Sequence, residues 1–174
     1  NPTHADWARI GGGDGVRGVW VIGGLLALVA VPAQADDGFP LTEREAKLEG
    51  CVQTARDIGA EVGICEGAVL ELCLADLTPE AAAGLEGFMC LQEEVFAWDN
   101  VTLRASHDYV TLIEGRADIS HEPFVAEMGE RLAAETETCL DFPTGQEALV
   151  LDCQIYWAID RLSWVYGLSE AARQ

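Results

Sequence analysis

Positive charge is scarce in this sequence of 174 residues, which has 10 Lys and Arg residues against 30 Asp and Glu residues. The formal net charge is −20 at pH 7, and the sequence pI is about 4.2. Because so acidic a chain repels phosphate groups, the composition argues against a nucleic-acid partner. The same charge favours a cationic partner and would speed its capture. Solvation of a salt-adapted protein explains the charge equally well.

Signatures of catalysis and of metal binding are also absent. The sequence has no H-E-x-x-H, G-x-S-x-G, P-loop or G-x-G-x-x-G pattern, and its cysteines lack the paired C-x2-C spacing of zinc sites. His107 and His121 each precede an acid, but adjacent residues on a helix point in different directions, so we interpret both as surface polar residues. We therefore predict a protein that is not an enzyme and binds no cofactor or metal. A carboxylate hydrolase that uses Glu94 is the alternative from the enzyme class.

No segment shows the sustained alternation of apolar and polar residues that is typical of strands. Apolar residues recur instead at helical spacing, and capping residues or glycine and proline mark the ends of these segments. The expected helices cover about 43–58, about 79–114, the segment from Ser120 to Pro143, and the segment from a capping box at 144–147 to about Gly167. We predict an all-α fold, a small bundle of about four helices stapled by disulfides.

The predicted helix over 79–114 has the longest apolar stripe, which we expect to face the core. Gly84 and Gly87 either weaken its first turns or permit close packing. The stripe consists of Leu85, Phe88, Met89, Val95, Phe96, Leu103, Tyr109, Val110 and Ile113.

A short apolar run occupies residues 18–31 and is preceded by Arg9 and Arg17. It is too short for a comfortable transmembrane helix, and a small-residue cleavage site ends at Ala35. This order is typical of a secretory signal peptide, so we predict a signal peptide over 1–35 with cleavage after Ala35. An uncleaved anchor is the alternative.

The predicted mature domain spans residues 36–174 and keeps the net charge of −20, since 1–35 contains two basic and two acidic residues. We expect it to be periplasmic or secreted, with no stable membrane anchor after cleavage. Translation that begins at Val16 would make residues 1–15 an extension outside the natural product.

All six cysteines lie in the predicted mature domain, and an even number in an exported chain predicts disulfides. Six cysteines allow fifteen pairings. Cys65 and Cys73 are close enough to pair locally, while Cys51 with Cys90 and Cys139 with Cys153 would each tie two helices. These three pairs are the predicted connectivity.

The most distinctive stretch runs from Cys90 to Asp99. On a helix, Cys90, Glu94 and Trp98 lie four residues apart and share one face, and Asp99 sits one step round. A tryptophan in this setting is typically a core anchor whose N–H donates to a nearby acceptor.

The order Cys51, Cys65, Cys73 and then Cys90-x3-Glu94-x3-Trp98-Asp99 resembles the exported LprI-like family, in the form seen in alphaproteobacteria. The resemblance covers about 48–100 and, more loosely, the final helix from Cys153. It implies a small helical envelope protein, and the family takes its name from a lysozyme inhibitor.

The chain departs from the family pattern at two places. The family continues L-N-x-x-Y after the Trp-Asp pair, where this chain has Thr102, Leu103 and Ser106. The family's second signature has a Trp and Arg residues that are missing before Cys139. These departures place the chain, at most, among diverged members.

The predicted function is that of an exported acidic helical binding protein that inhibits lysozyme or another basic wall-degrading enzyme. Glu93, Glu94 and Asp99 are the acids predicted to contact the cationic partner. The alternative is a structural or stress-related envelope protein with no lytic target, whose acidity serves only solvation.

Overall fold

Helices supply all the regular structure in the residues that the computed structural model describes, 42–143 and 145–174. These residues belong to one compact unit, Phe39–Gln174. The all-α prediction is confirmed, while the predicted signal peptide and its cleavage after Ala35 lie outside the described residues. In chain order the elements are α1 (Glu43–Asp57), the 3-10 turn η2 (Val62–Cys65), α2 (Ala68–Ala75), α3 (Pro79–Ala82), α4 (Leu85–Ile113), α5 (Glu122–Cys139) and α6 (Glu147–Ala172).

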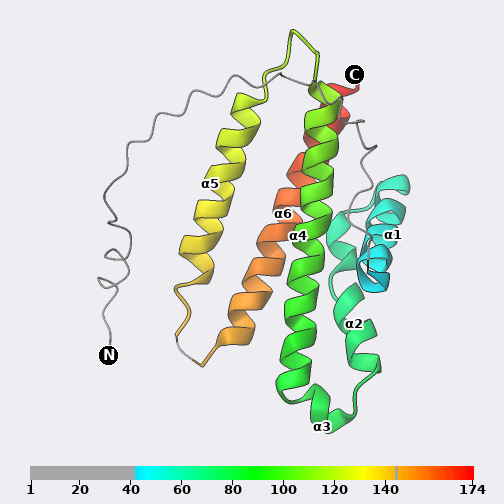
Figure 1. The fold of residues 1–174 in the computed structure, drawn as a ribbon, viewed down its shortest axis with the longest axis vertical. Coiled ribbons are helices and arrows are strands. Elements are labelled where there is room, and N and C mark those ends of the chain that lie inside the picture. The colour runs from blue at the N-terminus through cyan, green and yellow to red at the C-terminus, as the bar shows by residue number, and fades with distance from the viewer. Residues whose placement is uncertain (1–41, 144) are drawn as a thin grey trace, which may run out of the picture. The chain divides into compact units, whose positions relative to one another are not determined.

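The helices pack around the pair α4 and α6, which run side by side for most of their length (Figure 1). Helices α4, α5 and α6 alternate in direction, α5 packs against α6, and α1 and α2 pack against α4. Within the described ranges, no helix is both long and apolar enough to cross a bilayer.

The predicted capping box starts α1. The Thr42 hydroxyl accepts a hydrogen bond from the Glu45 amide at 3.2 Å, and the Glu45 carboxylate accepts one from the Thr42 amide at 2.8 Å. The pKa of the Glu45 carboxyl lies below its ordinary value. Burial alone would raise this pKa, but the hydrogen bonds that the carboxylate accepts from Thr42 and Asn100 lower it by more. The cap therefore also links α1 to α4.

The predicted helix over 79–114 is broken into α3 and α4. Gly84 is the N-cap of α4 and has extended backbone. A Cβ atom at Gly87 would lie 1.8 Å from the carbonyl oxygen of Ala82, so a larger residue there would force the two helices apart. Of the two roles expected for these glycines, Gly87 has the second, close packing.

The core-facing side of α4 differs from the prediction. Val95, Tyr109 and Ile113 are buried, but five of the nine members of the predicted stripe are exposed. The exposed members are Leu85, Met89, Phe96, Leu103 and Val110. The physical reason is that small residues share the inward side of α4. Ala97, Val101 and Ala105 are buried there, and the buried Thr102 donates to the Ala158 carbonyl of α6 at 3.4 Å.

The last helix extends past its predicted end at Gly167. Ser169 and Ala172 are both buried, so α6 stays packed to its last turn. Its N-cap is Gln146, with no side-chain capping bond, and Thr144 of the predicted second capping box lies outside the described residues.

A buried arginine crosslinks the three long helices. Arg161 of α6 is 3% exposed and pairs with Asp99 of α4 at 2.7 Å and with Glu135 of α5. Burial lowers the pKa of the Arg161 guanidinium, and the negative charge of Asp99 opposes this shift. An arginine suits this position because its planar group reaches two carboxylates at once.

Three disulfides staple the fold, and only one has the predicted pairing. Cys139–Cys153 is confirmed. The predicted Cys65–Cys73 and Cys51–Cys90 pairs are wrong, because the bridges are Cys51–Cys65 and Cys73–Cys90.

The reason for this pairing is local geometry. Cys65 ends η2 and Cys73 lies in α2, and the left-handed turn at Gly67 separates the two elements. Cys65 therefore pairs with α1, and Cys73, on the other side of the turn at Gly67, pairs with α4. The bridges place the protein in an oxidising, extracytoplasmic environment.

The Cys139–Cys153 bridge closes the turn between α5 and α6, with a sequence separation of 14. We expect the Cys139→Ser/Cys153→Ser variant to lose about 3 kcal/mol of unfolding free energy. Without the bridge, the unfolded chain regains the conformational entropy that closing a loop of this length removes. Urea unfolding followed by circular dichroism measures the change. Mass mapping under non-reducing conditions is the control and should still find the other two bridges. An unchanged midpoint would show that the turn is held without the bridge.

Candidate functional site

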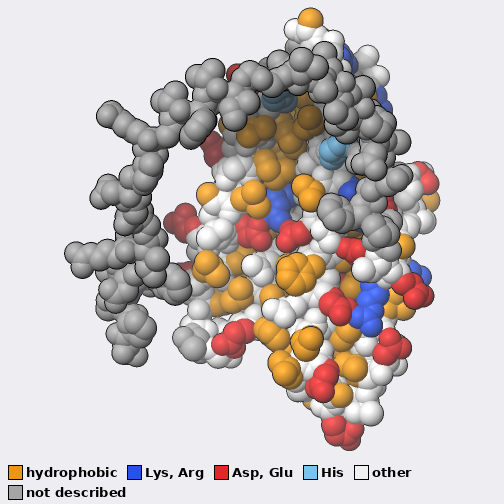
Figure 2. Space-filling model, in the orientation of Figure 1, with side chains coloured by type: hydrophobic (Ala, Val, Ile, Leu, Met, Phe, Trp, Pro, Cys, Tyr) orange, Lys and Arg blue, Asp and Glu red, His pale blue; other side chains and the backbone are white. Residues whose placement is uncertain are grey.

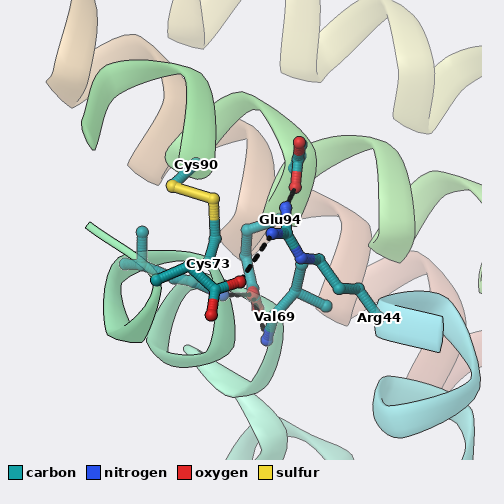
Figure 3. The surroundings of a disulfide bond; sticks show 8 residues. Arg44, Val69, Cys73, Cys90 and Glu94 are labelled. Carbon is teal, nitrogen blue, oxygen red and sulfur yellow. Dashed lines mark hydrogen bonds and ion pairs between the residues drawn. A yellow bond between two sulfur atoms is a disulfide. The ribbon is translucent and has the colours of Figure 1, made fainter. Parts of the chain in front are cut away.

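The carboxylate of Glu94 on α4 is fully buried. One of its oxygens accepts from the Gly67 amide at 3.0 Å and the Trp98 indole N–H at 2.7 Å. The other accepts from the Val69 and Leu70 amides at 2.7 and 2.8 Å. Figure 3 shows Glu94 beside the start of α2 and the Cys73–Cys90 disulfide.

These hydrogen bonds make Glu94 the N-terminal cap of α2. Gly67 occupies the N-cap position with φ of 84°, in the left-handed region that favours glycine, and has no side chain with which to cap the helix. The first amides of α2 need an acceptor, and a carboxylate at the positive end of the helix dipole is a favourable one. The cap comes from a residue 27 positions away in the chain.

The spacing of Cys90, Glu94 and Trp98 has a direct structural meaning. Cys90 ties α4 to Cys73 near the end of α2, and Glu94 caps the start of the same helix. Trp98 is fully buried and orients the Glu94 carboxylate, so its predicted role as a core anchor with a paired N–H is confirmed. The sequence motif therefore docks α2 onto α4.

The burial of Glu94 corrects its predicted role. A side chain with no exposed surface cannot contact a partner on the folded protein, so the prediction of Glu94 as a binding acid is wrong. The same four hydrogen bonds leave it no free lone pair for a substrate, and this removes the residue that the hydrolase alternative named.

The other two predicted acids lie at the surface but have internal partners. Glu93 is 47% exposed and pairs with Arg44 of α1. Asp99 is 48% exposed and pairs with Arg161. Burial raises the pKa of the Asp99 carboxyl, and the Arg161 guanidinium counteracts part of this shift. Each acid thus forms an intramolecular ion pair while about half of its side chain stays exposed to solvent.

Together with the exposed Glu86, Glu93 and Asp99 form what we call the acidic face of α4. Arg104 is the only Arg or Lys of α4, and its guanidinium is directed to Glu49 of α1 at 3.3 Å. His107 lies one turn further along, 63% exposed. Around Glu86, Glu93 and Asp99 the acidic face therefore carries no Lys or Arg of its own helix.

Internal ion pairs use most of the positive charge. Six of the seven arginines that the structure describes lie within 4.0 Å of a carboxylate of the fold. The arginines so paired are Arg44, Arg56, Arg104, Arg116, Arg131 and Arg161. Many exposed acids have no such partner, so the surface field is negative and is available to a cationic molecule.

Open grooves lie on the surface of the residues that the structure describes. The larger one has a volume of about 850 Å³ and lies along α1 and α2, beside the Cys51–Cys65 bridge. A second, of about 620 Å³, lies between α1, α2 and α4 and is lined by Leu72, Glu93 and Phe96 among others. In the described ranges, no group of three His, Cys, Asp or Glu side chains is arranged to hold a metal ion.

In comparisons with known proteins, no family model, curated protein or solved structure matches the chain. The resemblance to the LprI-like family accordingly stays a prediction that rests on the motif residues.

The Glu94 cap is testable by a near-isosteric change. We expect Glu94→Gln to lower the free energy of unfolding by about 2–3 kcal/mol, because the amide that replaces one oxygen cannot accept from buried N–H donors. Urea unfolding monitored by circular dichroism gives the value. Glu93→Gln, one residue away but exposed, is the matched control and should change stability by less than about 1 kcal/mol. Equal effects of the two variants would contradict the assigned role of Glu94.

Proposed function

We propose that the protein is an exported acidic binding protein, without catalytic activity of its own, that captures a cationic protein on the acidic face of α4. The observation that carries this proposal is the pairing of six arginines with carboxylates of the same fold, which leaves a surface with surplus carboxylates. The disulfides support an extracytoplasmic site of action, and we place the protein in the periplasm or outside the cell, after cleavage of a signal peptide at Ala35.

Lysozyme is the first candidate partner. It is supported by the motif Cys90-x3-Glu94-x3-Trp98-Asp99, which resembles the LprI-like family, and by the strong positive charge of animal lysozymes. The departures from the family pattern after Asp99 and before Cys139 are the reason for testing inhibition directly.

The mechanism is electrostatic capture followed by steric block. The negative field attracts the cationic partner over distances comparable to the Debye length, about 10 Å at 0.1 M salt. Glu93 and Asp99 each exchange part of their internal pairing for contact with the partner, since their carboxylates are about half exposed. The bound bundle then covers the basic rim of the cleft and excludes the wall polymer.

A turnover assay on bacterial wall suspensions tests this function. We expect excess protein to inhibit lysozyme at about 0.03 M salt and to inhibit it at least tenfold less at about 0.3 M salt, because screening removes the long-range attraction. The Glu86→Gln/Glu93→Gln variant should inhibit about threefold to tenfold less well, mainly through slower association.

The control is Glu130→Gln/Glu137→Gln, which makes the same charge change on exposed positions of α5. An equal loss in this variant would show that the acidic face of α4 is not the docking surface. Unchanged lysozyme turnover at both salt concentrations would remove lysozyme as the target and favour the structural or stress-related envelope role.

A further inference from the structure

The exposed side of α4 carries a regular row of large apolar residues. Met89, Phe96, Leu103 and Val110 follow one another at intervals of seven, and they are 53%, 64%, 68% and 36% exposed. We call these four residues the α4 stripe. Hydrophobic side chains lie on the face of the molecule over α4, among acidic ones (Figure 2).

A row of this kind is unusual on a soluble surface. Single exposed apolar residues are common, whereas an ordered array on one helix marks an interaction site. The core does not require these residues, because the opposite side of α4 is already packed against α1, α2 and α6.

The interval of seven defines the shape that fits the stripe. Apolar residues at heptad spacing drift by about 20° per heptad around a straight helix, and a second helix follows such a row by winding around it in a left-handed sense. From Met89 to Val110 the stripe extends about 32 Å, given a rise of 1.5 Å per residue. A partner helix of about 20 residues would cover it.

The charged residues beside the α4 stripe indicate which charge a partner helix would carry. Glu93 and Asp99 lie on either side of Phe96, each half exposed beside its arginine partner, and Glu86 lies near the start of the helix. Acids therefore flank the first half of the apolar row, whereas Arg104 and the exposed His107 belong to its second half. Phe96 also lines the hollow of about 620 Å³ together with Leu72, which leaves room for one large apolar side chain of the partner.

We propose that the α4 stripe is the docking site of an amphipathic helix from another polypeptide, with an apolar face flanked by Lys or Arg. The proposal rests on the proposed function and specifies it: the cationic partner presents a helix. The apolar row supplies the buried contact, and the flanking acids on both sides supply orientation and selection.

The flanking charges argue against two other occupants. A second copy in parallel pairing would place Glu93 and Asp99 against the same acids of the other copy. In an antiparallel pairing centred on the stripe, the two Asp99 side chains would approach one another, and like charges are unfavourable in both cases. An anionic membrane surface would be repelled by the same acids.

The test uses a synthetic helix as the probe, a fluorescent peptide of about four heptads with Leu at both seam positions and Lys beside them. Fluorescence anisotropy measures its binding to the full chain. We expect the Phe96→Gln/Leu103→Gln variant to bind at least tenfold more weakly, because two large apolar contacts are lost. Both residues are exposed, so circular dichroism should report an unchanged fold.

Two controls separate the apolar contribution from charge. Val125→Gln on α5 removes an apolar side chain that is 60% exposed and should leave peptide binding unchanged. A peptide of identical composition with a scrambled order keeps the charge and loses the apolar face, and it should bind at least tenfold more weakly than the ordered peptide.

Equal binding of the ordered peptide to the wild type and the double variant would overturn the proposal, as would equal binding of the scrambled peptide. Sedimentation that shows a wild-type dimer abolished by the double variant would overturn it in favour of a second copy. Preferential binding to vesicles of anionic lipid would overturn it in favour of a membrane.

Failure of this proposal is distinguishable from failure of the proposed function. If the double variant inhibits lysozyme as well as the wild type does, the function stands and the stripe is not its docking site. If the peptide requires the stripe while lysozyme is unaffected, the stripe binds a helix and the lysozyme target is wrong.

Discussion

The buried carboxylate of Glu94 is the interaction on which the arrangement of the first half of the fold depends. A charged group without solvent is costly unless donors surround it, and here four N–H groups do so. Three of those donors are amides at the start of α2, so satisfying the carboxylate fixes α2 against α4. The Cys73–Cys90 bridge fixes the other end of the same short helix. A helix of 8 residues is too short to be stable alone and is held here at both ends.

The second constraint is the close contact between α4 and α6. The buried Thr102 of α4 donates to the Ala158 carbonyl of α6 where the two helices meet. Arg161 then reaches across to Asp99 and to Glu135. The inward side of α4 is filled by Trp98 and Tyr109 together with smaller residues, while Phe96, Leu103 and the rest of the stripe lie on the surface. The stripe and the acidic face share one side of this helix, so a single surface offers both apolar contact and negative charge to a partner.

The sequence was sufficient for the fold class, the first capping box and the anchoring role of Trp98, since each depends on local spacing. It failed for the inward side of α4, because hydrophobicity alone does not reveal that Ala105 is buried while Phe96 and Leu103 are exposed. It also failed for two disulfides, since the left-handed turn at Gly67 redirects the chain between Cys65 and Cys73. Glu94 looked like a surface acid because no local signal identifies a cap that serves a helix 25 residues earlier in the chain. The spacing of Cys90, Glu94 and Trp98 on one face was the only available sign.

The most direct measurement of this central interaction is amide hydrogen exchange at the start of α2. First-turn amides of a helix ordinarily exchange fast because they have no acceptor within the helix. Our account predicts that the Val69 and Leu70 amides exchange as slowly as those of the buried segment around Val101, since Glu94 holds them. Exchange at the rate of a solvent-exposed amide would contradict it.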